Sequence, residues 1–167
     1  MHVLLMGPCG SGKTTVGEAL SLSLSCPFFD ADSFHSAASK AKMALGQPLN
    51  DSDRAPWLAS IAQRMQEEHS AGRSCVFSCS ALKLAYRDTL RAALPPGQMH
   101  CFLLLADASV LAARLSARAH PFMNPTLLAS QLATLEIPHS AEHASVIDCT
   151  SLSVAQVVEA VQQQCKM

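Results

Sequence analysis

The chain has 167 residues, of which 49% are hydrophobic and 15% are charged, and its formal net charge is −1. This length predicts a single domain that can bury a core without a disulfide or a metal. The near-neutral charge argues against a general nucleic-acid binder, the apolar composition argues against a disordered chain, and no apolar run is long enough to span a membrane.

Short apolar runs alternate along the chain with segments of helical periodicity. The predicted strands are residues 3–6, 27–30, 74–78, 100–105 and 145–148. The predicted helices are residues 14–25, 33–45, 56–69, 83–94, 108–118 and 154–164, and residues 120–125 are expected to form a loop. This alternation predicts an α/β fold in which helices cover both faces of a parallel sheet. Ligands of such sheets bind beyond the carboxyl ends of the strands.

Residues 7–14 match the phosphate-binding pattern G-x-x-x-x-G-K-[ST], with a predicted strand before them and a predicted helix after them. The glycines allow backbone N–H groups to surround phosphate oxygens, and the helix N-terminus adds positive potential. We expect Lys13 to reach the β- and γ-phosphates and the Thr14 hydroxyl to hold Mg²⁺. The residues assigned to ATP binding here are Gly7, Pro8, Cys9, Gly10, Ser11, Gly12, Lys13, Thr14 and Thr15.

The phosphate-binding loop predicts a nucleoside triphosphate but does not specify the reaction. A chain of 167 residues leaves little room for the switch regions and base-recognition loops of a GTPase. A small kinase is the compact alternative. Asp30 ends the second predicted strand and Asp32 follows it, where one acid can support Mg²⁺ and the other can accept a hydroxyl proton. The alternative is that these acids only cap the next helix.

Charged and polar residues near the starts of two predicted helices are further candidates. Asp51, Asp53 and Arg54 precede a helix, where acids can also serve only as caps. His35 follows Asp32 closely and either contacts a polar substrate or lies in solvent.

Two helices carry cations at four-residue spacing. Lys83, Arg87 and Arg91 share one face, which indicates either a site for an anionic substrate or a solvated stripe. Arg114 and Arg118 repeat the spacing before the predicted loop, either to stabilise a triphosphate or as an exposed basic face.

Together these residues resemble the gluconokinase family of small P-loop kinases, which is related to shikimate and adenylate kinases. The resemblance runs from the phosphate-binding loop to about Pro138. Beyond that loop it is carried by Asp30-Ala31-Asp32 with His35; Lys42-Met43, Gly46, Pro48-Leu49, Asp51, Asp53-Arg54 and Pro56-Trp57; Cys79 to Lys83 with Tyr86-Arg87-Asp88; Arg114 and Arg118; and Phe122-Met123, Leu127-Leu128, Ser130-Gln131, Leu135-Glu136 and Pro138.

The resemblance implies a three-layer α/β/α P-loop NTPase fold like that of nucleoside monophosphate kinases. It implies five parallel strands in the order 2-3-1-4-5, in one domain over residues 1–167 with a mobile lid at about 118–138. The implied reaction is ATP-dependent, Mg²⁺-assisted phosphorylation of D-gluconate at the 6-hydroxyl, giving 6-phospho-D-gluconate for the pentose phosphate pathway. Family members are often dimers, so a homodimer is also implied.

The resemblance also implies roles for individual residues. Asp32 would position or deprotonate the attacking hydroxyl, Asp30 would support Mg²⁺ together with Thr14, and Arg118 would close over the phosphates. The implied catalytic residues are Lys13, Asp32 and Arg118, and Arg114 and Arg118 complete the ATP site. The implied substrate-binding residues are Asp32, His35, Lys42, Asp53, Arg54, Ser80, Lys83 and Arg87.

The lid departs from the family pattern. The family usually has His immediately before Phe-Met, whereas His120-Pro121 precedes Phe122-Met123 here. Because proline fixes φ and removes an N–H, we expect a different lid path and assign no role to His120.

Two other functions stay open. The first is a kinase of another small hydroxy acid such as shikimate, although that family tends to carry a glycine triplet where this chain has Cys79 to Lys83. The second is a non-catalytic nucleotide-binding module, which would be expected to lose Lys13, Thr14 or the acids.

The N-terminus lacks the basic and apolar segments of a signal peptide, so a cytoplasmic location and seven reduced cysteines are expected. The chain ends Cys165-Lys166-Met167, which resembles the S-K-L address of peroxisome-type, glycosome-like organelles. A chance tripeptide at a helix end is the alternative.

Overall fold

The structure is a computed structural model that describes residues 1–117 and 125–165. Its sheet has five parallel strands in the order β2-β3-β1-β4-β5, which confirms the predicted fold and strand order. The strands are β1 (His2–Met6), β2 (Phe28–Asp30), β3 (Cys75–Ser78), β4 (Met99–Leu105) and β5 (Ala144–Asp148). In the central strand, Leu4 lies opposite Phe77 of β3 and Cys101 of β4.

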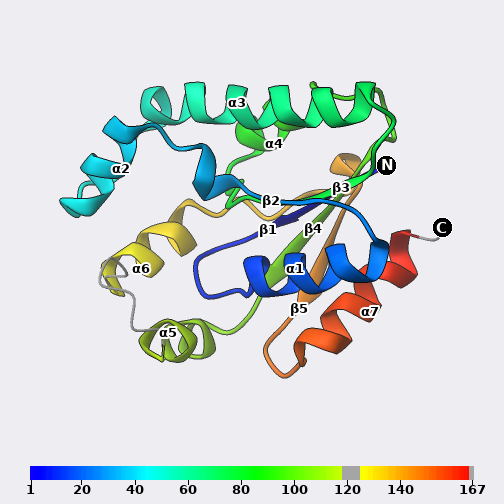
Figure 1. The fold of residues 1–167 in the computed structure, drawn as a ribbon. Coiled ribbons are helices and arrows are strands. Elements are labelled where there is room, and N and C mark those ends of the chain that lie inside the picture. The colour runs from blue at the N-terminus through cyan, green and yellow to red at the C-terminus, as the bar shows by residue number, and fades with distance from the viewer. Residues whose placement is uncertain (118–124, 166–167) are drawn as a thin grey trace.

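Helices cover both faces of this sheet (Figure 1). The α-helices are α1 (Lys13–Leu24), α2 (Ala37–Ala44), α3 (Asp51–Ser70), α4 (Leu84–Arg91), α5 (Ala108–Ser116), α6 (Pro125–Thr134) and α7 (Val154–Cys165). Two short 3₁₀ helices, η1 (Ala31–Phe34) and η2 (Ser140–Glu142), follow β2 and precede β5. The drawing shows α3 and α4 above the sheet and α1 and α7 below it, so the molecule has three layers.

The core is divided into two parts because side chains alternate along each strand. Val3 and Leu5 of β1 pack with α1, α5 and α7, whereas Leu4 and Met6 pack with α3 and α4. All four side chains are almost completely buried. The apolar run of β1 is therefore the sequence of a strand covered on both faces.

Two predicted helix boundaries were wrong, and side-chain caps explain both. The predicted helix 33–45 is divided into η1 and α2, because the Ser36 hydroxyl accepts the Ser39 N–H and starts a new helix. Helix α3 begins at Asp51 rather than at residue 56, since Asn50 and Asp53 form a reciprocal capping box. Pro56 thus lies inside α3 and does not start it.

Helix α6 was not predicted, since its residues fall in the segment expected to be a lid. Arg118 and the lid sequence 120–124 lie outside the described residues. The same is true of Lys166 and Met167 in the C-terminal tripeptide. All seven cysteines are free thiols, as expected. Within the described ranges, the helices are too short or too polar to cross a membrane.

Candidate active site

The phosphate-binding loop connects β1 to α1 at the carboxyl edge of the sheet. Gly7 and Gly10 take φ angles of +138° and +80°. A Cβ at Gly7 would lie 2.4 Å from the Leu104 carbonyl oxygen, and one at Gly10 would lie 2.8 Å from that of Leu111. Glycine is therefore required at both positions by conformation and by close backbone approach.

The N-terminus of α1 is open to an anion. Gly12 occupies the cap position, where it supplies no side-chain acceptor, and the first turn contains no acidic residue. The first N–H groups of the helix and its positive dipole end are thus available to a ligand oxygen. The Ser11 hydroxyl is buried and has no hydrogen-bond partner in the described part of the chain. These features fit a bound phosphate group.

Lys13, Thr14, Asp30 and Asp32 come together from α1, β2 and η1. The Lys13 ammonium donates to the Pro8 carbonyl at 2.9 Å, and the Thr14 hydroxyl donates to Asp30 Oδ2 at 2.8 Å. Asp30 Oδ1 accepts the Asp32 N–H at 3.0 Å. Asp30 therefore caps η1 and also contacts the phosphate-binding loop, so the two interpretations of this acid coexist.

Asp32 and Lys13 influence each other's protonation. Desolvation and then repulsion from Asp30 raise the pKa of Asp32, while Lys13 and His35 oppose that rise. Desolvation lowers the pKa of Lys13, and Asp32 is the largest factor opposing it. The side chain of Asp32 is 87% exposed, so it remains open to a ligand.

A cavity of about 440 Å³ adjoins the phosphate-binding loop. Arg114 lines it and donates to the Cys149 carbonyl at 2.7 Å, so this predicted ATP-site residue does lie beside the loop. Residues before and within α7 complete the wall: Leu152, Ser153, Val154 and Val157. They were missed in the sequence because they carry no polar motif and only the fold brings them to the loop.

Gln131 of α6 contacts the phosphate-binding loop, which its position in the sequence alone did not reveal. Its Oε1 accepts the Cys9 N–H at 2.6 Å, although the two residues are far apart along the chain. An N–H donor requires an oxygen acceptor, so this contact also fixes the orientation of the amide. Helix α6 is thereby attached to the phosphate-binding loop.

A second cavity, of about 540 Å³, lies between the start of α3, the start of α4 and α6. Arg54 and Lys83 line it, together with Asp51. Lys83 donates to both carboxylate oxygens of Asp51 at 2.9 and 3.0 Å, and the Tyr86 hydroxyl donates to the same carboxylate. Both contacts lower the pKa of Asp51.

Arg54 has a different environment. Its Nη1 donates to the Tyr86 hydroxyl at 3.2 Å, and its guanidinium lies 5.7 Å from the centre of the Tyr86 ring. Among the described residues, no carboxylate forms an ion pair with Arg54. Its charge is therefore available for an anionic group in this cavity.

Lys42 and Asp53 form an ion pair with a distance of 2.5 Å between Nζ and Oδ2. Asp53 also accepts the Asn50 N–H within the capping box. Both predicted substrate-binding residues thus already have protein partners, and the capping interpretation of Asp53 is confirmed.

His35 stacks on Trp57, with ring centres 4.5 Å apart and nearly parallel planes. Trp57 is fixed by its indole N–H, which donates to the Ala31 carbonyl at 2.7 Å. His35 Nε2 lies 4.0 Å from Asp32, and Nδ1 is buried without a partner in the described residues. His35 is therefore a rigid wall residue with an unused polar atom, and not a solvated side chain.

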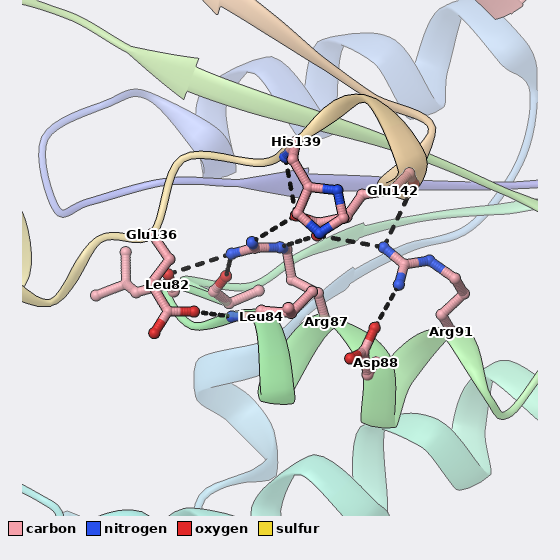
Figure 2. A network of polar contacts seen from close by, with 9 residues as sticks. Leu82, Leu84, Arg87, Asp88, Arg91, Glu136, His139 and Glu142 are labelled. Atoms are coloured by element: carbon pink, nitrogen blue, oxygen red, sulfur yellow. Dashed lines mark hydrogen bonds and ion pairs between the residues drawn. The ribbon is translucent and has the colours of Figure 1, made fainter.

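Arg87 does not have the environment of a substrate ligand, so that assignment was wrong. It is 1% exposed, and its guanidinium binds the carboxylate of Glu142 at 2.6 and 3.0 Å (Figure 2). Arg91 also contacts Glu142, at 3.5 Å. The predicted basic face is therefore divided: Lys83 lines the second cavity and pairs with Asp51, whereas the buried acid Glu142 of η2 binds Arg87 and contacts Arg91. The remaining predicted residue, Ser80, accepts the Gly7 N–H through its carbonyl at 3.1 Å.

Comparison with known sequences places this chain among small kinases. Residues 9–166 match the profile of the family described as "Shikimate kinase". A "Probable gluconokinase" from Dictyostelium discoideum is 44% identical over 167 residues, covering 95% of this chain and 83% of that protein. A "Gluconokinase" from Gluconobacter oxydans is 44% identical over 141 residues, covering 84% of this chain and 78% of that protein.

Solved structures agree. A sugar kinase from Janibacter is 41% identical with a TM-score of 0.89, covering 97% of this chain and 92% of that one. A gluconokinase from Sinorhizobium meliloti is 39% identical with a TM-score of 0.84, covering 95% of this chain and 87% of that one. A shikimate kinase from Acinetobacter baumannii shares the fold. It is 16% identical with a TM-score of 0.60, and the match covers 98% of this chain and 92% of that one. The chain therefore belongs to the gluconokinase family, a sugar-acid branch of the kinases related to shikimate kinase.

Proposed function

We propose that this protein transfers the terminal phosphoryl group of ATP to the 6-hydroxyl of D-gluconate, with Mg²⁺ as cofactor. The observation that carries the proposal is the position of Asp32. This open carboxylate with a raised pKa interacts with Lys13 of the phosphate-binding loop on one side and with His35 on the other. A proton acceptor thus lies where a phosphate site adjoins a polar wall.

The phosphate-binding loop and the neighbouring cavity would hold ATP. The open N-terminus of α1 and the unpartnered Ser11 hydroxyl suit the phosphates, and the cavity of about 440 Å³ suits the nucleoside. Arg114 lines that cavity and would add positive charge near the phosphates. Arg118 is proposed to close over the phosphates as a lid residue, and only the family resemblance supports this role.

The oxygen atoms of Thr14 and Asp30 fit a magnesium ion. They lie 2.8 Å apart, and a hydroxyl with a carboxylate is the hard-oxygen donor set that Mg²⁺ prefers. When bound, the ion neutralises charge on the transferred phosphoryl group. Asp30 would support it directly or through water.

Gluconate carries one carboxylate, and the charge of the second cavity suits a monoanion. Lys42 and Lys83 are already paired with Asp53 and Asp51, which leaves the positive charge of Arg54 unbalanced. Arg54 can therefore form charge-assisted hydrogen bonds with the substrate carboxylate. The unpartnered Nδ1 of His35 offers a further contact to a substrate hydroxyl.

Asp32 would accept the proton of the attacking hydroxyl. Partial desolvation and repulsion from Asp30 raise the pKa of its carboxyl group, which favours proton transfer. The remaining task of the protein is to align the hydroxyl with the phosphoryl group and to neutralise charge, which Lys13 and Thr14 are placed to do. The product, 6-phospho-D-gluconate, would enter the pentose phosphate pathway.

An ADP-release assay with several acceptors tests this function. We expect ATP consumption that depends on D-gluconate and is much weaker with shikimate, with gluconate epimers and with nucleoside monophosphates. No turnover of gluconate at millimolar concentration, or preferred turnover of shikimate, would contradict the proposal.

A further inference from the structure

The segment 79–84, named here the substrate loop, follows β3 and carries Ser80 and Lys83. Ala81, in its middle, has a φ of +40°. A residue with a Cβ rarely adopts this left-handed conformation, so the surrounding structure must hold it in place. Strain of this kind concentrates at functional sites.

Arg87 binds the backbone of this loop directly. Its Nη1 donates to the carbonyl oxygens of Ala81 and Leu82, at 3.3 and 3.2 Å. Its Nε and Nη2 donate to the two carboxylate oxygens of Glu142. One buried guanidinium therefore makes contacts in two directions, to the strained part of the loop and to η2 (Figure 2).

Glu142 is itself held in place. Its carboxylate accepts the His139 N–H at 3.0 Å, and Arg91 contacts its carbonyl oxygen at 3.4 Å. The hydrogen bonds from Arg87 lower the pKa of Glu142 to about 2, so the acid stays ionised at neutral pH. Glu142 is 4% exposed and Arg87 is 1% exposed, so the pair is a fixed and charged anchor in the interior.

The segment that follows α6 binds the same loop at a second point. The Glu136 N–H donates to the Leu82 carbonyl at 2.8 Å, and its carboxylate accepts the Leu84 N–H at 2.5 Å. Figure 2 shows Leu82 reached by both Arg87 and Glu136. The substrate loop is therefore held by the chain that connects α6 to β5.

We propose that Arg87 and Glu142 are positioning residues that set the place of Ser80 and Lys83 in the sugar-acid site. The inference rests on the proposed gluconate kinase function and on the substrate-binding role that the family resemblance implies for those two residues. A movement of Ala81 would also reach Ser80, whose carbonyl accepts the Gly7 N–H of the phosphate-binding loop. The pair also stabilises the fold, but the contacts of Arg87 to the Ala81 and Leu82 carbonyls act directly on the backbone of the loop.

Two variants test the proposal. Glu142→Gln removes the charge but keeps the size of the side chain. Arg87→Lys keeps the charge opposite Glu142, but a single ammonium cannot reproduce the forked contacts to the carboxylate and to both carbonyls. We expect both variants to raise the KM for the acid acceptor, and to lower kcat/KM about tenfold or more, with the KM for ATP changed less than twofold.

A second ion pair provides a matched control. Arg73 binds Glu68 at 2.6 and 3.1 Å in the same forked geometry, and Glu68 is 3% exposed. This pair lies at the opposite end of the sheet, beside Cys75 at the start of β3. Glu68→Gln should lower the melting temperature and leave both KM values unchanged.

Hydrogen exchange supplies a readout that does not depend on the substrate. We expect the amides of residues 80–84 to exchange faster in Glu142→Gln and in Arg87→Lys than in Glu68→Gln. If the wild type phosphorylates another acid of the panel, the proposed function fails, and the KM of the variants is then measured with that acid. If the wild type phosphorylates none of the acids, hydrogen exchange alone tests the positioning role. Unchanged exchange in the substrate loop, or equal increases in the KM of ATP and acceptor in folded variants, would overturn the positioning role. Should Glu142→Gln not fold, Arg87→Lys carries the test.

Discussion

The Thr14 hydroxyl donates to the Asp30 carboxylate at 2.8 Å and so joins the start of α1 to the end of β2. The two residues lie on different elements, and the parallel sheet brings them to one edge. This contact places a hydroxyl and a carboxylate oxygen beside the open helix N-terminus. Metal dependence can therefore be tested at Asp30.

Asp30→Ala should weaken the Mg²⁺ dependence of the reaction. We expect the Mg²⁺ concentration for half-maximal rate to rise roughly 10- to 100-fold, as for other groups that support a metal. A magnesium titration of the initial rate measures it. Asp148→Ala is the matched control. Asp148 ends β5 and accepts the Thr150 N–H at 2.9 Å, just as Asp30 ends β2 and accepts the Asp32 N–H. An equal change in both variants would contradict the metal role.

Asp32→Asn should reduce kcat far more than nucleotide affinity. An amide cannot accept the hydroxyl proton, and loss of a general base lowers the rate roughly 10²- to 10⁴-fold. Steady-state kinetics together with ADP binding by calorimetry separate the two effects. A parallel loss of rate and of ADP affinity would show that Asp32 serves the nucleotide rather than the acceptor.

The same substitution should stabilise the fold at neutral pH. The pKa of Asp32 is raised in the folded state, so its ionised form disfavours folding once the pH exceeds that pKa. Removing the charge should therefore raise the melting temperature at pH 7, although only slightly, because solvent screens a side chain that is 87% exposed. The wild-type rate should also fall as the pH decreases through the pKa of Asp32, because the protonated acid cannot act as base. A lower melting temperature for Asp32→Asn would exclude this electrostatic account.

Glu142 should make stability depend on acid pH. Its pKa is lowered from 4.5 to about 2, so its contribution is fully present above about pH 4.5 and is lost as the pH falls towards 2. A shift of this size corresponds to about 3 kcal/mol of unfolding free energy. Urea unfolding of the wild type and Glu142→Gln should therefore differ at pH 6 and converge near pH 2. A constant difference over this range would argue against an ionised Glu142.

Much of the nucleotide half of the site could be predicted from local sequence. The glycines, Lys13 and Thr14 are consecutive, and their function follows from the backbone of one loop between one strand and one helix. Asp30 is the last residue of the next strand. The parallel sheet then requires these strand ends to share an edge, so a correct prediction of strands also predicts that the residues meet.

The environment of Arg87 could not be predicted in this way. Its partner Glu142 is 55 residues away and lies on a 3₁₀ helix that has no sequence signature. On α4 alone, spacing with Lys83 and Arg91 indicated a cationic face. Only the return of the chain before β5 shows that the arginine is buried and neutralised. The apolar wall around Leu152 and the contact between Gln131 and Cys9 are long-range features of the same kind.

The start of α3 shows a different limit. Proline is favoured at the first position of a helix, so a predicted start at Pro56 agrees with local preference. In the structure the side chains of Asn50 and Asp53 satisfy each other's backbone N–H groups, and the helix begins before the proline. The error matters for function, because the correct start places Asp51 and Arg54 on the rim of the second cavity.

Phosphorus NMR of the reaction product tests the central claim most directly. After incubation of the protein with ATP, Mg²⁺ and D-gluconate, we expect one new phosphomonoester signal that is split into a triplet by the two methylene protons at C6. A doublet, which marks phosphorylation of a secondary hydroxyl, or the absence of any new phosphomonoester, would contradict the assignment as a gluconate 6-kinase.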